Sequence, residues 1–178
     1  MSDYIITYTG TKFYPVTPIA KDIHIEDIAH ALSLMTRANG HFKHFYSVGL
    51  HCLNCVREAK ARGFSKRVQL GCLLHDASEA YLSDITRPVK QHLHKYKEIE
   101  KHLQDMIFAY FGLGDLKEEE VEQIFQMDDV VLHHEFLFFR EVGVFDNMPP
   151  MISEPDFEER RFKDVEDRFL ALFKELKV

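Results

Sequence analysis

The spacing of hydrophobic residues predicts a chain built almost entirely from helices. Apolar side chains recur every three or four residues, the interval that places them on one face of a helix, over residues 25–35, 45–61, 95–111, 117–140 and 156–176. A further helix after Ser65 is apolar on nearly every side over residues 68–74, so we expect it at the centre of the core. The pattern predicts an all-α bundle of five to seven helices, forming one domain over residues 1–178 with its core in 20–140.

The other segments interrupt this helical spacing. Residues 4–17 are rich in β-branched and aromatic side chains and turn at Gly10, which predicts an extended or β-hairpin arm at the N-terminus. Residues 37–44 are expected to form a polar loop and residues 145–155 a Pro-rich loop, while Pro88 predicts a helix break. The predicted apolar stripe of the 117–140 helix consists of Val121, Ile124, Phe125, Val131, Leu132, Phe136 and Phe139.

Composition and charge narrow the class of protein. The chain has 178 residues, of which 46% are hydrophobic and 29% charged, values ordinary for a water-soluble globular protein. A net charge of -7 without a basic run argues against a general nucleic-acid binder. The chain shows no apolar run of transmembrane length and no signal-peptide layout, so we expect a cytoplasmic protein without membrane contact. Three cysteines, an odd number, argue against a disulfide framework.

The pair His75-Asp76 stands at the end of the apolar helix, where two polar residues are costly to bury without partners. In one interpretation Asp76 bonds a local backbone group and His75 is partly exposed. In the other, both bind a metal ion. Glu79 and Asp84 follow within ten residues, and a divalent cation would offset their charge and lower the pKa of a bound water. A neighbouring carboxylate is then available as a general base, which favours the metal site.

Two distant polar residues interrupt other apolar faces and are candidates for further ligands. His51 shares a helix face with Val48 and Cys55, and Asp128 interrupts the stripe of the 117–140 helix. Imidazole and carboxylate ligands suit several ions, so we expect one divalent metal ion, Mn, Co, Zn, Fe, Ni or Mg. Cys52 and Cys55 form a C-x-x-C inside a helix, and because no second cysteine pair exists, core packing is the favoured interpretation.

The segment LLHDASEAYLSDITRPVK (73–90) resembles the core of HD-domain nucleotide phosphohydrolases, particularly bacterial HD-type 5′-deoxynucleotidases and their phage-encoded relatives. Residues 27–52, 95–113 and 127–135 resemble three further blocks of that family in the same order. The resemblance implies an HD-domain helical bundle. It also implies a set of site residues, which are the metal ligands His51, His75, Asp76 and Asp128, the water-activating Glu79, the sugar neighbour Asp84, and the phosphate contact Arg37, assisted by His41 or Lys43. Apart from the resemblance, Lys90 beside the polar stretch 91–97 is a further candidate for a contact with the phosphate.

Two ligand positions have rivals within the sequence. His41 and His44 compete with His51, which is preferred because a Tyr-Ser-Val precedes it at the family's offset and because it lies mid-helix. Asp129 competes with Asp128, which is preferred because Glu135 follows seven residues later, as in the family. The chain also departs from the family pattern. Cys52 replaces a frequent Ser, and Ala38 replaces an aromatic residue that helps to define the sugar or base pocket, so deoxyribose selectivity is the least supported implication.

These features together predict a metal-dependent phosphohydrolase whose partner is a small-molecule nucleotide. The favoured substrate is a deoxynucleoside 5′-monophosphate, and the alternative is a deoxynucleoside triphosphate such as dATP. A non-catalytic nucleotide-binding regulator is the rival from another class, and the presence of both Glu79 and Asp84 argues against it. Relatives are often dimers, and the Phe-rich helices are compatible with a homodimer.

Overall fold

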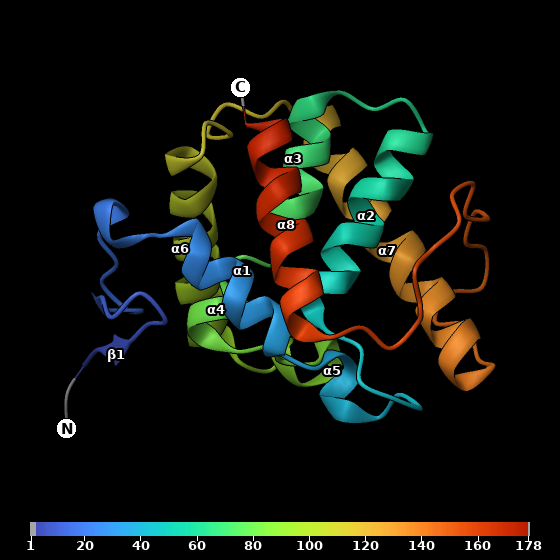
Figure 1. Cartoon of the computed structure of the whole chain (residues 1–178), viewed down its shortest axis with the longest axis horizontal. Coiled ribbons are helices and arrows are strands. Elements are labelled where there is room, and N and C mark those ends of the chain that lie inside the picture. Colours follow the sequence, from blue (N-terminus) through green and yellow to red (C-terminus); the bar gives the residue numbers. More distant parts are fainter. Residues whose placement is uncertain (1–2, 178) are drawn as a thin grey trace.

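The structure, a computed structural model, describes residues 3–177 and confirms the all-helical prediction (Figure 1). Its helices of nine residues or more are α1 (Ile25–Leu34), α2 (Val48–Ala61), α3 (Lys66–Leu74), α6 (His94–Tyr110), α7 (Glu118–Arg140) and α8 (Phe162–Leu176). Two single turns, α4 (Glu79–Leu82) and α5 (Arg87–Lys90), and two 3-10 turns, Ala20–Asp22 and Arg37–Gly40, complete the helical elements. None of the helices in the described part combines the length and apolarity that crossing a membrane requires.

The N-terminal arm is the predicted hairpin. Its strands β1 (Ile5–Ile6) and β2 (Lys12–Phe13) pair antiparallel, with Ile5 opposite Phe13. Gly10 has a φ of 84°, a left-handed conformation that glycine adopts without strain, and it forms the turn between the strands. Phe13 is fully buried and stacks on Tyr81 of α4, and the backbone N–H and hydroxyl of Thr9 both donate to the Asp27 carboxylate of α1. The hairpin is therefore anchored to two helices of the body.

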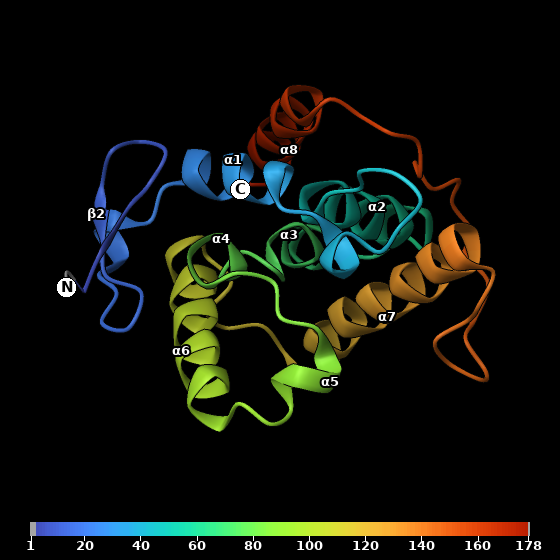
Figure 2. The same cartoon turned by 90° about the horizontal axis from the view of Figure 1, so that it is seen from below.

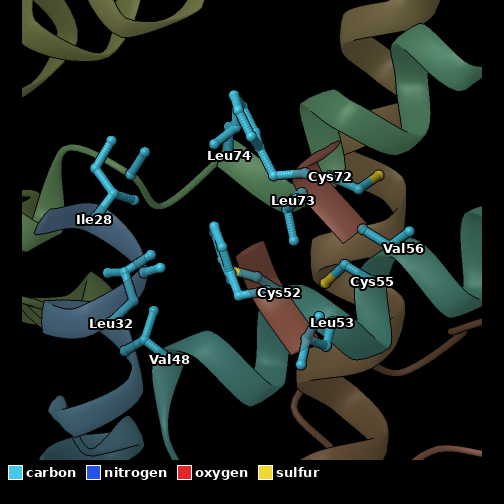
Figure 3. Packing of buried hydrophobic residues seen from close by; sticks show 14 of the residues in the cluster. Ile28, Leu32, Val48, Cys52, Leu53, Cys55, Val56, Cys72, Leu73 and Leu74 are labelled. Atoms are coloured by element: carbon cyan, nitrogen blue, oxygen red, sulfur yellow. The ribbon is translucent and has the colours of Figure 1, made fainter. Parts of the chain in front are cut away.

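Helix α3 lies at the centre, as its apolar surface predicts, and packs against α2, α7 and α8 (Figure 2). The Ser65 side chain begins the helix by accepting a hydrogen bond from the backbone N–H of Val68, at 3.2 Å. Figure 3 shows Cys72, Leu73 and Leu74 among buried residues of α1 and α2. Gly71 faces Ile124 of α7 so closely that an added Cβ would collide with it, which brings α3 and α7 together at the level of the candidate site.

Four details differ from the sequence prediction. Helix α2 begins at Val48 instead of 45, because the Ser47 side chain accepts a hydrogen bond from the backbone N–H of Leu50 at its start. Helix α8 begins at Phe162 instead of 156. The residues before it form a strap, residues 145–161, without regular secondary structure, and Asn54 of α2 holds the backbone of Asp156 within it. The helix break precedes Pro88, at Ser83 with a φ of 86°, and Pro88 lies in the first turn of α5, where its missing N–H has no helical partner to lose. Phe125 is 62% exposed, because its neighbour Ile124 faces α3 and successive helix residues point about 100° apart.

Candidate metal centre

Four side chains predicted as metal ligands converge where α2, α7 and the end of α3 meet. His51 comes from the first turns of α2, His75 and Asp76 follow α3, and Asp128 lies in the middle of α7. The Nε2 atom of His51 lies 3.2 Å from Nε2 of His75 and 3.1 Å from Oδ1 of Asp128. Oδ2 of Asp76 lies 3.3 Å from Nε2 of His75 and 3.9 Å from Nε2 of His51. The two helices and one helix end thus direct two imidazoles and two carboxylates to one point.

These separations fit ligands of a single ion. Two ligand atoms that each lie about 2.1 Å from one metal are roughly 3 to 4 Å apart. Oδ2 of Asp76 is buried and has no hydrogen-bond partner, although a buried carboxylate oxygen left without one is costly. A divalent cation would supply the missing partner. The residues therefore fit a metal, and their role as ligands remains a prediction.

Contacts on the outer side of both imidazoles favour the same arrangement. Nδ1 of His51 lies 2.7 Å from Oε1 of Glu135, which is fully buried and also accepts a hydrogen bond from the Tyr46 hydroxyl at 2.8 Å. Nδ1 of His75 lies 2.8 Å from the backbone oxygen of Cys72. Acceptors at both Nδ1 atoms place the ring proton there and leave both Nε2 atoms free to bind a metal.

The rival ligands are directed elsewhere. His44 has Nδ1 3.1 Å from the backbone oxygen of Phe45, and Oδ1 of Asp129 accepts from Arg87 at 2.6 Å. Neither is within hydrogen-bonding distance of the four converging atoms. His41 is exposed, at the C-terminal end of the 3-10 turn Arg37–Gly40. The structure therefore brings together the set preferred from the sequence.

Glu79 and Asp84, the predicted catalytic carboxylates, lie beside this cluster. Glu79 is 4% exposed, its Oε1 lies 3.6 Å from Nζ of Lys90, and its Oε2 has no partner. Burial, together with the charges of Asp76 and Asp84, raises the pKa of Glu79 well above its usual value. Burial is also the largest influence on Asp84, whose pKa is raised. Carboxyl groups with raised pKa values are suited to exchanging protons near neutral pH.

Arg37 is the buried cation of the site. Its NH1 lies 3.5 Å from Oδ2 of Asp76 and its NH2 3.4 Å from Oε2 of Glu135. It begins a turn in which Ala38 and Asn39 both have a φ near 50°, a left-handed conformation that strains residues other than glycine. The turn is fastened by the hydrogen bond from the Arg37 backbone N–H to the backbone oxygen of Tyr46, at 2.9 Å. Strained backbone beside Asp76 is thus held by the surrounding fold.

Helix α5 places two further cations at the cluster. Lys90 lies between Glu79 and Glu100, 2.7 Å from Oε1 of the latter. Arg87, which sequence reasoning missed, donates at 2.6 Å to Oδ2 of Asp128, while Oδ1 of the same carboxylate faces the two imidazoles. The one local signal was that Arg87 precedes Lys90 by three residues, so both share a helix face.

His41 and Lys43, expected to assist Arg37, lie away from the cluster. His41 is exposed, and the exposed Lys43 has its Nζ 3.7 Å from Oε1 of Glu141, a residue just beyond α7. The segment after Gly40 turns outward, so proximity to Arg37 in sequence does not become proximity in space. A substrate-binding role for these two residues remains a prediction.

Comparisons with known proteins identify a family and two relatives. A family model described as HD domain matches residues 32–170. The chain is 37% identical over 110 residues to the uncharacterized protein YfdR of Escherichia coli, a match covering 62% of this chain and 59% of that protein. It is 36% identical over 129 residues to an uncharacterized protein of Rhodobacter capsulatus, covering 69% of this chain and 65% of that protein. The matched regions thus span less than two thirds of the length of either relative.

Proposed function

Because this chain belongs to the HD domain family, we propose that it is a metal-dependent phosphohydrolase acting on a deoxynucleoside 5′-monophosphate. One observation carries the proposal: four side-chain atoms predicted as metal ligands converge beside a buried carboxyl oxygen, Oε2 of Glu79, that has no hydrogen-bond partner. A fold without chemistry to perform has no physical need for both a set of converging ligand candidates and a buried carboxyl oxygen without a hydrogen-bond partner. The products would be a nucleoside and inorganic phosphate.

The side chains of the site have distinct tasks in this proposal. A divalent cation held by the four ligands would act as a Lewis acid and lower the pKa of a water molecule. Glu79 accepts the proton of the attacking water, because its carboxyl group is buried and free to form a new hydrogen bond. Arg37 donates to the phosphoryl oxygens as charge develops on them. The water oxygen bonds to phosphorus as the bond from phosphorus to the 5′ oxygen breaks, and the proton that Glu79 took from the water passes to the leaving 5′ oxygen.

Although the protein is acidic overall, with a net charge of -7, three cationic side chains gather at the site, which supports a phosphate-bearing substrate. Each of three cations at the site contacts a carboxylate of the cluster: Arg37 contacts Asp76, Lys90 contacts Glu79, and Arg87 contacts Asp128. Three cations also favour a second candidate, hydrolysis of a deoxynucleoside triphosphate with release of triphosphate, because a longer phosphate chain carries more charge. Asp84 is partly buried nearby and is proposed to contact the sugar.

A product assay tests this proposal. The full chain is loaded with Mn²⁺ or Co²⁺ and incubated with a panel of ribo- and deoxynucleoside mono- and triphosphates, and the products are separated by chromatography. We expect orthophosphate from deoxynucleoside monophosphates. Release of triphosphate would instead support the second candidate. Nucleotide binding without any product, in protein shown to hold its metal, would contradict both and leave a regulatory protein.

A further inference from the structure

Three buried cysteines surround the metal centre without forming disulfides. Cys52, Cys55 and Cys72 have no exposed surface, and Figure 3 shows them in the core between α2 and α3. Cys55 lies one helical turn after His51 on α2, and its Sγ is 3.5 Å from Nε2 of His51. This nitrogen is the ligand atom of the predicted centre. The thiol of Cys55 is therefore directed at the metal position as well as at apolar neighbours.

The sulfur is at a separation that a shared ion would impose. One ligand atom each from His51, Cys55 and His75 lie within 4.8 Å of one another. With metal–nitrogen bonds of about 2.1 Å, metal–sulfur bonds of about 2.3 Å and angles of about 90° to 110° between neighbouring ligands, nitrogen and sulfur are about 3.1 to 3.6 Å apart. Two nitrogens are about 3.0 to 3.4 Å apart over the same angles. The observed 3.5 Å and 3.2 Å are close to these values.

We propose that Cys55 is a thiolate ligand of the metal centre and makes it selective for zinc or cobalt over magnesium and manganese. Soft thiolate ligands favour such ions, whereas carboxylate and water ligands suit magnesium and manganese. The inference rests on the proposed function only in that the same His and Asp side chains bind a metal. It goes beyond it by naming a sulfur ligand and the class of ion.

Binding changes the protonation of the thiol without any redox step. A cysteine thiol, with an ordinary pKa of about 8.5, is held as S–H near neutral pH when no metal is bound. A coordinating metal deprotonates a thiol. The S–H bond breaks as the sulfur–metal bond forms, and the proton passes to the buffer.

The chain offers neighbouring cysteines as comparisons. Cys52 Sγ lies within 4.8 Å of ligand atoms of His75 and Asp76, on the same side of α2. Cys72 is equally buried, but its thiol belongs to neither of these groups, and only its backbone oxygen contacts His75. Cys72→Ser therefore removes a buried thiol in the same core while keeping that backbone contact, and it is the matched control.

Titration of the metal-free full chain with Co²⁺ tests the inference. Thiolate ligation of Co²⁺ produces a near-ultraviolet sulfur-to-metal charge-transfer band that nitrogen and oxygen ligands do not produce. We expect the band in the wild type and in Cys72→Ser, and its loss in Cys55→Ser. Competition titrations should show zinc affinity falling at least about tenfold in Cys55→Ser, with a smaller change for Mg²⁺ and Mn²⁺.

The outcomes separate this inference from the proposed function. A Co²⁺-loaded wild type without the band overturns it, even if Cys55→Ser fails to fold. A band that persists in Cys55→Ser and disappears in Cys52→Ser overturns it as well, by assigning the sulfur to Cys52. The spectra do not depend on hydrolysis. Nucleotide hydrolysis without the band would therefore contradict only the thiolate ligand, and the band without hydrolysis would contradict only the substrate.

Discussion

Helix α2 carries two buried polar clusters that differ in how completely their hydrogen bonds are made. On one side His51 reaches the metal centre, where Oδ2 of Asp76 and Oε2 of Glu79 have no hydrogen-bond partner. On the other side Glu58, also fully buried, accepts from the backbone N–H groups of Ile152 and Ser153, the Ser153 hydroxyl and Arg62. A buried polar group with every bond made stabilises the structure, whereas one without a partner needs a separate explanation, and beside four converging ligand candidates that explanation is a bound ion or substrate.

The completed cluster fastens a strap, residues 145–161, along α2. Asn54 donates to the backbone oxygen of Asp156 at 3.0 Å and accepts from its N–H at 2.9 Å. Arg62 reaches the backbone oxygen of Pro150 at 3.0 Å. Asn54, Glu58 and Arg62 follow one another at intervals of four, so they form one stripe of the helix. The strap has no helix or strand of its own, and side chains of this stripe hold it in place.

Removing a predicted ligand from the metal centre should have the largest effect on metal content and activity. Asp76→Ala deletes the carboxylate whose Oδ2 has no hydrogen-bond partner, so we expect metal content and hydrolysis to fall to background. Metal analysis and product assays on folded protein measure both. Asp115→Ala, at an exposed carboxylate beside Arg67, is the control and should keep both. Wild-type metal content and activity in Asp76→Ala would end the interpretation of this cluster as a metal centre.

A substitution of Glu79, whose Oε2 also has no hydrogen-bond partner, tests the chemical step separately from metal binding. In Glu79→Gln the amide cannot accept the proton of water, so kcat should fall by about 10²- to 10⁴-fold while metal content stays at the wild-type level. Steady-state kinetics with metal analysis resolve the two quantities. Glu98→Gln, at an exposed position of α6, controls for the loss of one negative charge. An unchanged kcat in Glu79→Gln would show that another group handles this proton.

Arg87 belongs to the metal centre although its own hydrogen bonds are made, because one of them is donated to the predicted metal ligand Asp128. Arg87→Ala frees Oδ2 of Asp128, and loss of such an orienting contact should weaken metal affinity by about 10- to 100-fold. Calorimetric metal titration measures the change. Arg67→Ala breaks a comparable pair with Asp115 away from the site and should leave affinity at the wild-type value. Equal affinities in both variants would limit Arg87 to holding α5.

A substitution in the Glu58 cluster should change the stability of the protein and leave the metal centre unaffected. Glu58→Gln should lower the free energy of unfolding by about 1 to 3 kcal/mol at pH 7 and leave metal content unchanged. Although burial opposes it, hydrogen bonds from Ser153, Ile152 and Arg62 lower the pKa of Glu58 in the folded state. Its contribution is therefore fully present above the unfolded pKa of about 4.3 and is lost as pH falls through the folded value.

Urea unfolding of wild type and Glu58→Gln at several pH values measures this contribution. The difference between the two proteins should be full near neutral pH and should shrink in acid. Glu175→Gln, at an exposed position near Lys60, is the matched control with little change. A difference that grows as pH falls, or lost metal in Glu58→Gln, would show that the two sides of α2 are not independent.

Local signals were enough for most elements. Ser65 begins α3 by accepting a backbone hydrogen bond, and Gly63 adopts the positive φ expected after α2. The start of α8 was misplaced because the strap is held by Asn54, whose partner is 102 residues away. Arg87 was missed for the same reason, since Asp128 is 41 residues away and no local pattern encodes the pair.

By itself, the sequence determined where the helices form and which polar residues interrupt their apolar faces, because both depend on periods of a few residues. It also marked His51, His75, Asp76 and Asp128 as candidates, through that interruption and a family resemblance. Only the tertiary structure decided which buried polar groups have all their hydrogen-bond partners and which have an atom without one. That outcome depends on side chains far apart in the chain, such as His51 and Asp128 across 77 residues, meeting at distances of a few ångströms.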